Sequence, residues 1–287
     1  MSDIRLTHPG VQAWRHVARS PSLLVGALLL VAICALALGA PYVTHNDPLD
    51  MVGTPFTWPG ADSAFPLGTD MMGRDMLSGI AYGARVSIEI GVAAGVLATV
   101  VGLVIGAIAG FYGGFIDNLL MRGAELFQTM PALLFTIVLV VVVHPNVSTI
   151  VLGVALTNWP QVARLVRAEG LRVRQAEFVQ AAIVIGMSRP RIVFTHVLPN
   201  VATSAIVMLS ILAGNAILTE AVLSFLGLGD PNVMTWGSMI GSGREALQTA
   251  WYMTALPGCA VLVTVLGLNL IGNGLNDLAN PHRRRTL

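Results

Sequence analysis

Six apolar segments, each about as long as a bilayer is thick, constrain the fold of this chain more than any other feature. They are residues 22–41, 86–110, 118–143, 147–164, 201–222 and 254–275. A helix needs about 20 apolar residues to cross a membrane, and a chain in lipid must satisfy its backbone hydrogen bonds internally. We therefore predict an all-α polytopic membrane protein with six transmembrane helices. The fourth span is the weakest, because it is short and ends in Asn158-Trp159-Pro160.

The composition supports a membrane protein and excludes several kinds of chemistry. The 287 residues are 55% hydrophobic and only 11% charged, whereas a soluble domain carries about 25% charged residues. A net charge of +1 gives no reason to expect a nucleic-acid partner. All 16 basic residues are arginine, so the chain lacks the lysine of a Walker A loop and the lysine of a Schiff-base enzyme. We expect no cofactor on this chain.

The arginines predict the orientation of the spans. Three precede the first span, six lie between the fourth and fifth spans, and three follow the sixth. With both termini inside, the outer loops hold only Arg74, Arg85 and Arg244. Arginine and lysine are enriched on the cytoplasmic side of membrane proteins. Both termini are therefore predicted to be cytoplasmic.

The spans divide the chain into five parts. These are a cytoplasmic N-terminal segment (1–21), the first transmembrane helix (22–41), an outer loop (42–85), a five-helix core (86–275) and a cytoplasmic tail (276–287). The core includes a cytoplasmic loop at 165–200. The first span has small residues at Ala35-Leu36-Ala37 that also suit signal cleavage, but its apolar run is long for a signal peptide. We interpret it as a retained helix.

The stretch 177–200 is predicted to be an ordered part of the cytoplasmic loop. It begins with good helix formers, and Gly186 supplies a stop. Ser188 can cap a second short helix with Pro190 in its first turn, and Pro199 is expected to end that helix before the next apolar run. Two short helices hinged at a glycine just inside the membrane suit docking onto a soluble partner.

Five sequence motifs resemble those of ATP-binding-cassette (ABC) importer permeases. The stretch 177–200 resembles their Glu-Ala-Ala loop at Gln180-Ala181-Ala182, Gly186 and Leu198-Pro199. The other matches, which follow the family order, are Phe65–Ser87, Gly110–Asp117, Asn158–Arg167 and Ile217–Gly229. The resemblance runs from about residue 20 to residue 282 and is to the second permease of dipeptide, oligopeptide and nickel transporters.

The resemblance implies a fold and a set of partners. It implies the type I ABC importer permease fold in a bacterial inner membrane, where the outer loop 42–85 is periplasmic. The implied partners are a homologous second permease, two ABC ATPase subunits that carry ATP and Mg, an extracytoplasmic solute-binding protein and the lipid bilayer. The residues implied to couple to the ATPases are Glu177, Gln180, Ala181, Ala182, Gly186, Leu198 and Pro199. Gln180 stands where a carboxylate is common, and Glu177 can serve one turn earlier.

Among the ionisable residues in or near spans, three are candidates for a functional role. Charged groups inside a bilayer are costly and normally face protein or water. Arg122 and Glu125 are spaced i, i+3 and are predicted to pair, with a role at a gate or a permease interface as the functional hypothesis. Glu220 lies at the outer end of the fifth span. It is a candidate for the same roles, and a solvated helix end is the alternative.

The outer loop ends in a family signature that includes Gly68, Asp70, Gly73, Arg74 and Asp75. We expect Asp70, Arg74 and Asp75 to shape the loop through local ion pairs. The aspartates of this loop are spaced irregularly, so no metal site is predicted.

Small residues and one proline predict how the spans pack. In the second span, glycines recur mostly at i, i+4 spacing, which favours close helix packing over a pathway lining. They are Gly91, Gly95, Gly102, Gly106 and Gly110. Pro131 lies inside the third span and should kink it. Cys34 and Cys259 are expected to be small packing residues.

The predicted function is an ATP-driven, binding-protein-dependent importer permease without catalytic residues of its own. Di- and oligopeptides are the leading substrates, with nickel, opines, glutathione or another small solute as alternatives. An intramembrane protease is a rival, but no His-Glu-x-x-His is present and the histidines fall in loops or at span ends. A stand-alone channel or secondary transporter would predict inverted repeats or mid-span charges, and neither is visible.

Overall fold

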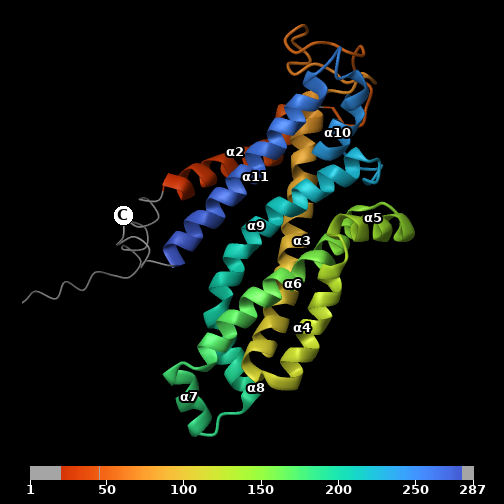
Figure 1. Cartoon of the computed structure of the whole chain (residues 1–287). Helices are drawn as coiled ribbons and strands as arrows, with labels where there is room; N and C mark the ends of the chain where they lie inside the picture. The colour runs from red at the N-terminus through yellow and green to blue at the C-terminus, as the bar shows by residue number, and fades with distance from the viewer. Residues whose placement is uncertain (1–20, 45, 280–287) are drawn as a thin grey trace, which may run out of the picture.

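The computed structural model describes residues 21–44 and 46–279, and every regular element in these ranges is a helix (Figure 1). The predicted N-terminal segment up to residue 20 and the arginines at 283–285 lie outside the described residues. Two isolated β-bridges, Met51 with Arg74 and Thr69 with Asp75, hold the outer loop together. The all-helical prediction is confirmed for the described part of the chain.

The helices follow one another with short connections after a long first loop. In chain order they are α2 (Pro21–Val43), α3 (Met76–Tyr112), α4 (Gly114–Thr129), α5 (Ala132–Val143), α6 (Val147–Arg174), α7 (Glu177–Val184), α8 (Arg189–Ile192), the π-helix η1 (Val193–Val197), α9 (Leu198–Phe225), α10 (Trp236–Gly243), the 3-10 helix η2 (Arg244–Ala246) and α11 (Tyr252–Ala279). Helix α3 starts ten residues before the predicted span, because Asp75 caps it inside the predicted loop.

Within residues 21–44 and 46–279, four helical segments are long and apolar enough to cross a membrane: α2, α3, the stretch Arg189–Phe225 and most of α11. The bent pair of α4 and α5 brings the number to five. The remaining predicted span, 147–164, lies on α6, where Asn158, Gln161 and Arg164 lower the hydropathy. The multi-pass helical fold is thus confirmed, with the fourth span the weakest, as predicted.

Helix α3 is the central helix, and its glycines let two other helices approach it closely (Figure 1). A Cβ atom on Gly91 would lie 2.6 Å from Cγ1 of Ile217 on α9. A Cβ on Gly106 would lie 2.5 Å from the carbonyl oxygen of Ala163 on α6. Gly95 likewise faces α9, and Gly102 and Gly110 face α6. The predicted packing role of these glycines is confirmed.

The third predicted span is broken rather than gently kinked. Helices α4 and α5 meet at an angle of 83°. Met130 is extended, and Pro131 is the N-cap of α5. Proline disfavours helical backbone in the residue before it and donates no hydrogen bond itself. The kink predicted at Pro131 is confirmed, and its angle makes α5 a separate helix.

An arginine from α3 compensates for a proline in α2. Pro41 lies inside α2 and has no N–H to donate to the carbonyl of Ala37. The Nε of Arg85 donates to that oxygen at 2.5 Å, and its Nη2 donates to the carbonyl of Leu38 at 3.3 Å. Helix α2 also lies close to α11, where a Cβ on Gly26 would meet the carbonyl of Gly267 at 2.8 Å. The first helix is therefore an integrated part of the bundle.

Pro199 does not end a helix, contrary to the prediction. Helices α8, η1 and α9 form one continuous stretch, Arg189–Phe225. Just before Pro199 the chain makes a π turn, in which the N–H of Leu198 donates to the carbonyl of Val193, five residues earlier. A wider turn accommodates a proline ring that would clash in a regular α-helix. The second short helix of the predicted loop, α8 with η1, is consequently the first part of the continuous stretch Arg189–Phe225.

The two cysteines are exposed on the surface of the described chain. The expected packing role for Cys34 and Cys259 is therefore wrong within this chain. Both thiols lie on the apolar helices α2 and α11, so their surfaces face lipid or another subunit.

We expect Gly106→Ala to lower the free energy of unfolding by about 1–3 kcal/mol, since the added methyl group would overlap backbone of α6. Gly258→Ala is the matched control, because a Cβ on this α11 glycine meets nothing within 4 Å. Denaturation of both variants in detergent, followed by tryptophan fluorescence, measures the difference. Equal stability of the two variants would contradict the packing of α3 described above.

Candidate functional site: the inner elbow and the outer cap

The inner elbow, residues 175–188, connects α6 to α8 at the lower end of the molecule in Figure 1. Helix α6 ends when the N–H groups of Gln175 and Ala176 donate to the carbonyls of Arg172 and Val173. Ala176 then takes an extended conformation and begins α7. These two residues make the turn between the helices, so α7 begins directly after the end of α6.

Gly186 ends α7 in a Schellman motif. Its N–H donates to the carbonyl of Ile183 at 3.0 Å, and the N–H of Met187 donates to Ala182 at 3.0 Å. The φ angle of Gly186 is +80°, a conformation that glycine adopts without steric cost. The predicted stop at Gly186 is confirmed. The predicted cap by Ser188 is wrong, since its side chain makes no capping hydrogen bond, while Pro190 does lie in the first turn of α8.

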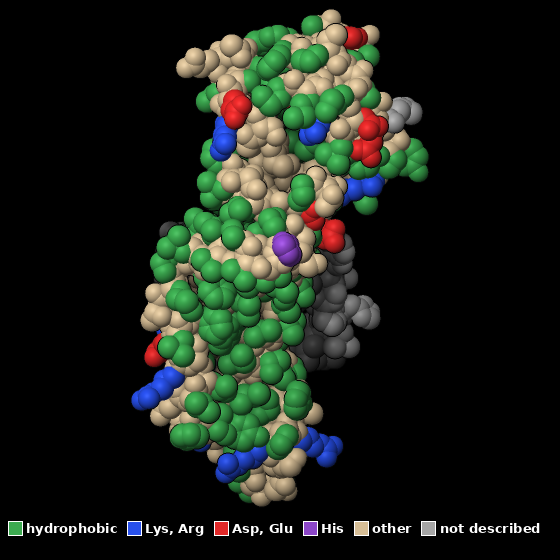
Figure 2. All heavy atoms as spheres, turned by 90° about the vertical axis from the view of Figure 1, so that its right-hand side faces the viewer, with side chains coloured by type: hydrophobic (Ala, Val, Ile, Leu, Met, Phe, Trp, Pro, Cys, Tyr) green, Lys and Arg blue, Asp and Glu red, His purple; other side chains and the backbone are tan. Residues whose placement is uncertain are grey.

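Helix α7 has one buried and one exposed apolar face. Val179 and Ala182 are buried in a cluster that also contains residues of α6, α8 and η1. On the other side, Phe178 is half-exposed, and Val184 and Ile185 are 86% and 78% exposed. Figure 2 shows basic side chains, all of them arginine in this sequence, beside apolar side chains at this lower end of the molecule. Because these exposed apolar groups are neighbours in the chain, this face of α7 is a candidate interaction surface.

The structure places the predicted coupling residues in two groups. Gln180 points back, and its Nε2 donates to the carbonyl of Arg174 at 2.8 Å, so it fastens α7 to α6. Glu177 and Ala181 are exposed on α7. Leu198 packs against the buried cluster and Pro199 is exposed, both at the start of α9. Glu177, Gln180 and Ala181 therefore lie on the elbow itself. Leu198 and Pro199 lie on the adjoining helix α9.

An ion pair beside the elbow joins the last residues of two family motifs. Asp117 on α4 accepts from Nε of Arg167 at 2.5 Å and from Nη2 at 2.6 Å. The pair ties α4 to α6 and places a carboxylate in the first turn of α4, where it interacts favourably with the helix dipole. Both residues end motifs identified in the sequence, but the sequence did not predict that they pair. The signal was an acidic residue at the end of one motif and a basic residue at the end of another.

The outer cap, residues 46–75, covers the other end of the molecule, above α10 and α11 in Figure 1. Gly68 and Gly73 both have a φ of +76°. A Cβ atom on either residue would lie 2.2 Å from a backbone oxygen of the cap. These two signature glycines are therefore required by backbone turns.

The signature aspartates bind backbone N–H groups and not the guanidinium of Arg74. Oδ1 of Asp70 accepts from the N–H groups of Met72 and Arg74, each at 2.8 Å. Asp75 caps α3 by accepting from Leu77 and Ser78. Burial raises the pKa of the Asp75 carboxyl group, and these two hydrogen bonds oppose the shift. The expected ion pairs are wrong, because no ion pair involves Arg74 among the described residues.

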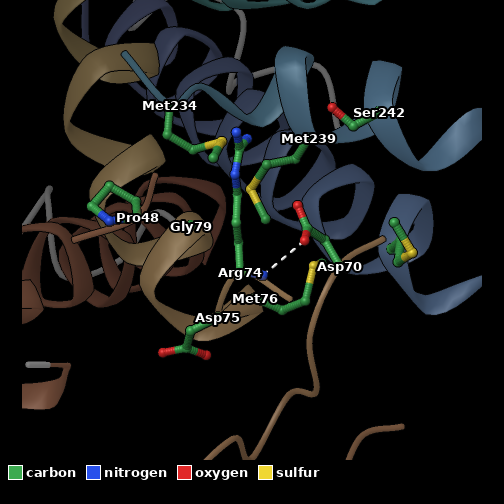
Figure 3. Close-up of a pocket in the computed structure, with 10 residues that line it drawn as sticks. Pro48, Asp70, Arg74, Asp75, Met76, Gly79, Met234, Met239 and Ser242 are labelled. Carbon is green, nitrogen blue, oxygen red and sulfur yellow. Dashed lines mark hydrogen bonds between the residues drawn. The ribbon is translucent and has the colours of Figure 1, made fainter. Parts of the chain in front are cut away.

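Arg74 extends into a small cavity between the cap and α10 (Figure 3). The cavity holds about 20 Å³ and is lined by Asp70 and by methionines, including Met234 and Met239. Within the described chain the Nε atom of Arg74 is buried without a hydrogen-bond partner. The volume is about that of one water molecule, and a water here would satisfy this N–H.

The cap is anchored to α11 by a tyrosine. The hydroxyl of Tyr252 lies 3.0 Å from the carbonyl oxygen of Thr57 and 2.8 Å from that of Thr69. Its ring packs against Trp58 with the centroids 5.3 Å apart. Trp236 of α10 donates from Nε1 to the carbonyl of Ile80 on α3 at 3.0 Å. Cap, α3, α10 and α11 thus form one connected unit.

Glu220 is fully buried, so the alternative of a solvated helix end is wrong. Its Oε1 accepts from the hydroxyl of Ser224 at 2.6 Å, and its Oε2 has no hydrogen-bond partner within the described chain. Arg122 and Glu125 are exposed on α4, and no ion pair joins them among the described residues. The predicted pairing of these two is therefore wrong. Their role at a gate or interface remains a hypothesis.

The described residues contain no group of three or more His, Cys, Asp or Glu side chains placed to hold a metal. The distinctive features of the molecule lie instead at its two ends. One end is the elbow with its exposed apolar face, and the other is the cap built from turns. Such an arrangement on a multi-pass helical bundle fits a membrane transport subunit. The family described as binding-protein-dependent transport system inner membrane components matches residues 102–285, and the chain belongs to this family.

Relatives match this chain in sequence over nearly the whole length of both proteins. A di/tripeptide transport system permease protein of Pseudomonas aeruginosa is 35% identical over 288 residues, covering 98% of this chain and 95% of the relative. A dipeptide transport system permease protein of Escherichia coli is 38% identical over 279 residues, covering 95% and 93%. A putative peptide transport system permease protein of Brucella suis is 37% identical over 275 residues, covering 95% and 92%.

We expect Gly186→Ala to loosen the elbow, because alanine at a φ of +80° costs about 1 kcal/mol. Nothing lies within 4 Å of the added methyl group, so the cost comes from the backbone alone. Hydrogen exchange of the segment 177–188 should accelerate about fivefold. The matched control is Gly123→Ala, an ordinary helical position with equally open space. Equal exchange in both variants would contradict the Schellman motif.

The ion pair between Asp117 and Arg167 should show a measurable coupling energy. A double-mutant cycle with Asp117→Ala and Arg167→Ala is expected to give about 1 kcal/mol, at the upper end for pairs with a partly exposed arginine. Unfolding of the four variants in detergent measures it. If the two substitutions add to within about 0.3 kcal/mol, the pair does not hold α4 to α6.

Proposed function

We propose that this chain is one of two permease subunits in an ATP-driven, binding-protein-dependent importer of di- and oligopeptides. The family membership supports the permease role, and the relatives above are named for peptide transport. The chain itself acts as a transport subunit and not as an enzyme. ATP and Mg are bound, and ATP is hydrolysed, on two partner ATPase subunits. The location is the bacterial inner membrane with both termini cytoplasmic.

The exposed apolar face of α7 is the observation that carries this proposal. Val184 and Ile185 project from the elbow, while the opposite face of α7 is packed into the cluster with α6 and η1. In this proposal a partner binds the exposed face of α7, and the packed face of α7 transmits the partner's movement to the helix bundle. An ATPase subunit that binds this face can therefore move α6 and α9 together.

The continuous helical stretch Arg189–Phe225 supplies the connection to the outer side. It begins at the elbow, passes along the glycines of α3 and ends beside α10, where Glu220 is buried. In the proposed cycle, closure of the ATPases tilts this stretch, and the cavity between the two permeases opens outward. The solute-binding protein docks on the outer side and releases its ligand there. The exposed apolar residues of α4, including Phe115 and Leu119, face lipid or the second permease.

Affinity purification of the tagged chain, expressed with its genetic neighbours, tests the proposal. The wild-type chain should recover a homologous permease and ATPase subunits. Val184→Glu should lose the ATPases and keep the second permease, because it places a charge on the apolar contact. Met51→Glu is the matched control: Met51 is 68% exposed, but it lies on the outer cap and should leave the complex intact.

Two results would overturn the assignment. Recovery of the folded chain without any ATPase would show that the elbow does not couple to one. Equal ATPase recovery with Val184→Glu and Met51→Glu would show that the ATPases bind elsewhere.

A further inference from the structure

We propose that a pocket at the outer end of α9 binds the two charged termini of a short peptide. The terminal ammonium lies at Asp230, and the terminal carboxylate lies at Arg244. The proposal rests on the function proposed above and names a substrate site on this chain. The pocket has a volume of about 320 Å³ and lies between the turn that follows α9 and the helix α10. This volume is at the small end of the usual range for ligand pockets, about 300–1,000 Å³.

The pocket carries one charge of each sign. Asp230 and Arg244 both line it, and neither forms an ion pair with another described residue. A zwitterion is the class of ligand that such a pair of charges recognises. A carboxylate binds an ammonium through charge-assisted hydrogen bonds, and a guanidinium binds a carboxylate in the same way.

Neighbouring groups hold both charged side chains in place without neutralising them. Oδ1 of Asp230 accepts from the N–H of Asn232 at 2.9 Å and from its side-chain amide at 3.1 Å. Oδ2 accepts only a long bond, 3.4 Å, from the N–H of Val147. The guanidinium of Arg244 lies over the ring of Phe225, 5.5 Å from its centroid, and donates to the carbonyl of Phe225 at 3.3 Å. Each group keeps capacity for a ligand.

The surface between the two charges suits a peptide backbone more than a particular side chain. Gly227, Gly229 and Gly241 contribute to the lining together with Phe225 and Pro231, and at the three glycines a ligand can approach the protein backbone closely. The hydroxyl of Ser242 donates to the carbonyl of Ser238 at 2.9 Å, and its lone pairs remain able to accept from a peptide N–H. The hydroxyl of Ser238 is used within α10, because it donates to the carbonyl of Thr235 and accepts from the N–H of the same residue. Recognition of the two termini with little side-chain contact fits a permease that passes peptides of varied sequence.

The pocket is connected to the helix that reaches the elbow. Ser224 lines the pocket and donates its hydroxyl to the buried Glu220. Both residues belong to the stretch Arg189–Phe225 that begins at the elbow. A tilt of this stretch therefore changes the pocket, which provides for binding in one state of the cycle and release in another.

Direct peptide binding to the assembled transporter tests the proposal. The chain, its partner permease and the ATPases are placed in nanodiscs without the solute-binding protein. Saturation-transfer NMR then measures binding of Ala-Ala, N-acetyl-Ala-Ala and Ala-Ala-amide. Each blocked peptide should bind about three- to fivefold more weakly than Ala-Ala, as expected for the loss of one partly solvated charge pair.

Two variants separate the roles of the charges. Asp230→Asn keeps an oxygen for the hydrogen bonds from Asn232. It should abolish the difference in affinity between Ala-Ala and N-acetyl-Ala-Ala, while Ala-Ala-amide still binds more weakly than Ala-Ala. Arg244→Gln should abolish the difference between Ala-Ala and Ala-Ala-amide, while N-acetyl-Ala-Ala still binds more weakly than Ala-Ala. Glu245→Gln is the matched control, because Glu245 is an exposed neighbour outside the pocket lining, and it should preserve both penalties.

The crossed pattern supports the proposal, and any other pattern overturns it. Equal binding of the three peptides by the wild-type transporter, or unchanged penalties in both variants, would show that the pocket does not read the termini. Basal ATP hydrolysis confirms that each variant is assembled, and Arg244→Gln tests the proposal by itself if Asp230→Asn does not assemble. A transporter that assembles and imports peptides without the crossed pattern would leave the proposed function standing. Failure to assemble with any ATPase would instead reject that function.

Discussion

The close approach of α3 to α6 and α9 is the constraint on which the rest of the structure depends. Helices in lipid gain little from the hydrophobic effect, so they associate through van der Waals contact and small residues. On α3 the glycines provide that contact, and a Cβ atom on Gly102 or Gly106 would lie 2.5 Å from atoms of α6. Helix α6 carries the inner elbow and α9 carries the pocket-lining end. Their shared support on α3 sets the relative position of the two functional ends.

The inner and outer ends of the molecule are joined by covalent and polar connections. The stretch Arg189–Phe225 runs without a break from the elbow to the turn before Asp230. Gln180 fastens the elbow to α6, and the pair of Asp117 and Arg167 fastens α6 to α4. At the outer end, Tyr252 and Trp236 connect the cap to the bundle. The elbow and the outer end are therefore connected through packed helices.

Features decided by local sequence could be predicted, and features decided by contacts between distant residues could not. The apolar segments, the glycine stop at Gly186 and the break at Pro131 follow from hydropathy and from backbone chemistry, which act within a few residues. Pro199 was misjudged because a π turn supported by the packed cluster lets the helix continue through it. The burial of Glu220 and the pocket between Asp230 and Arg244 depend on where α10 packs, and a single sequence does not reveal that placement.

Reconstitution of this chain in liposomes, with and without the second permease, the ATPases and the solute-binding protein, tests the central claim most directly. Uptake of a labelled dipeptide and hydrolysis of ATP are measured in the same vesicles. The account predicts uptake that depends on ATP and on every component, with neither activity from this chain alone. Peptide flux or ATP hydrolysis by the purified chain alone would contradict it.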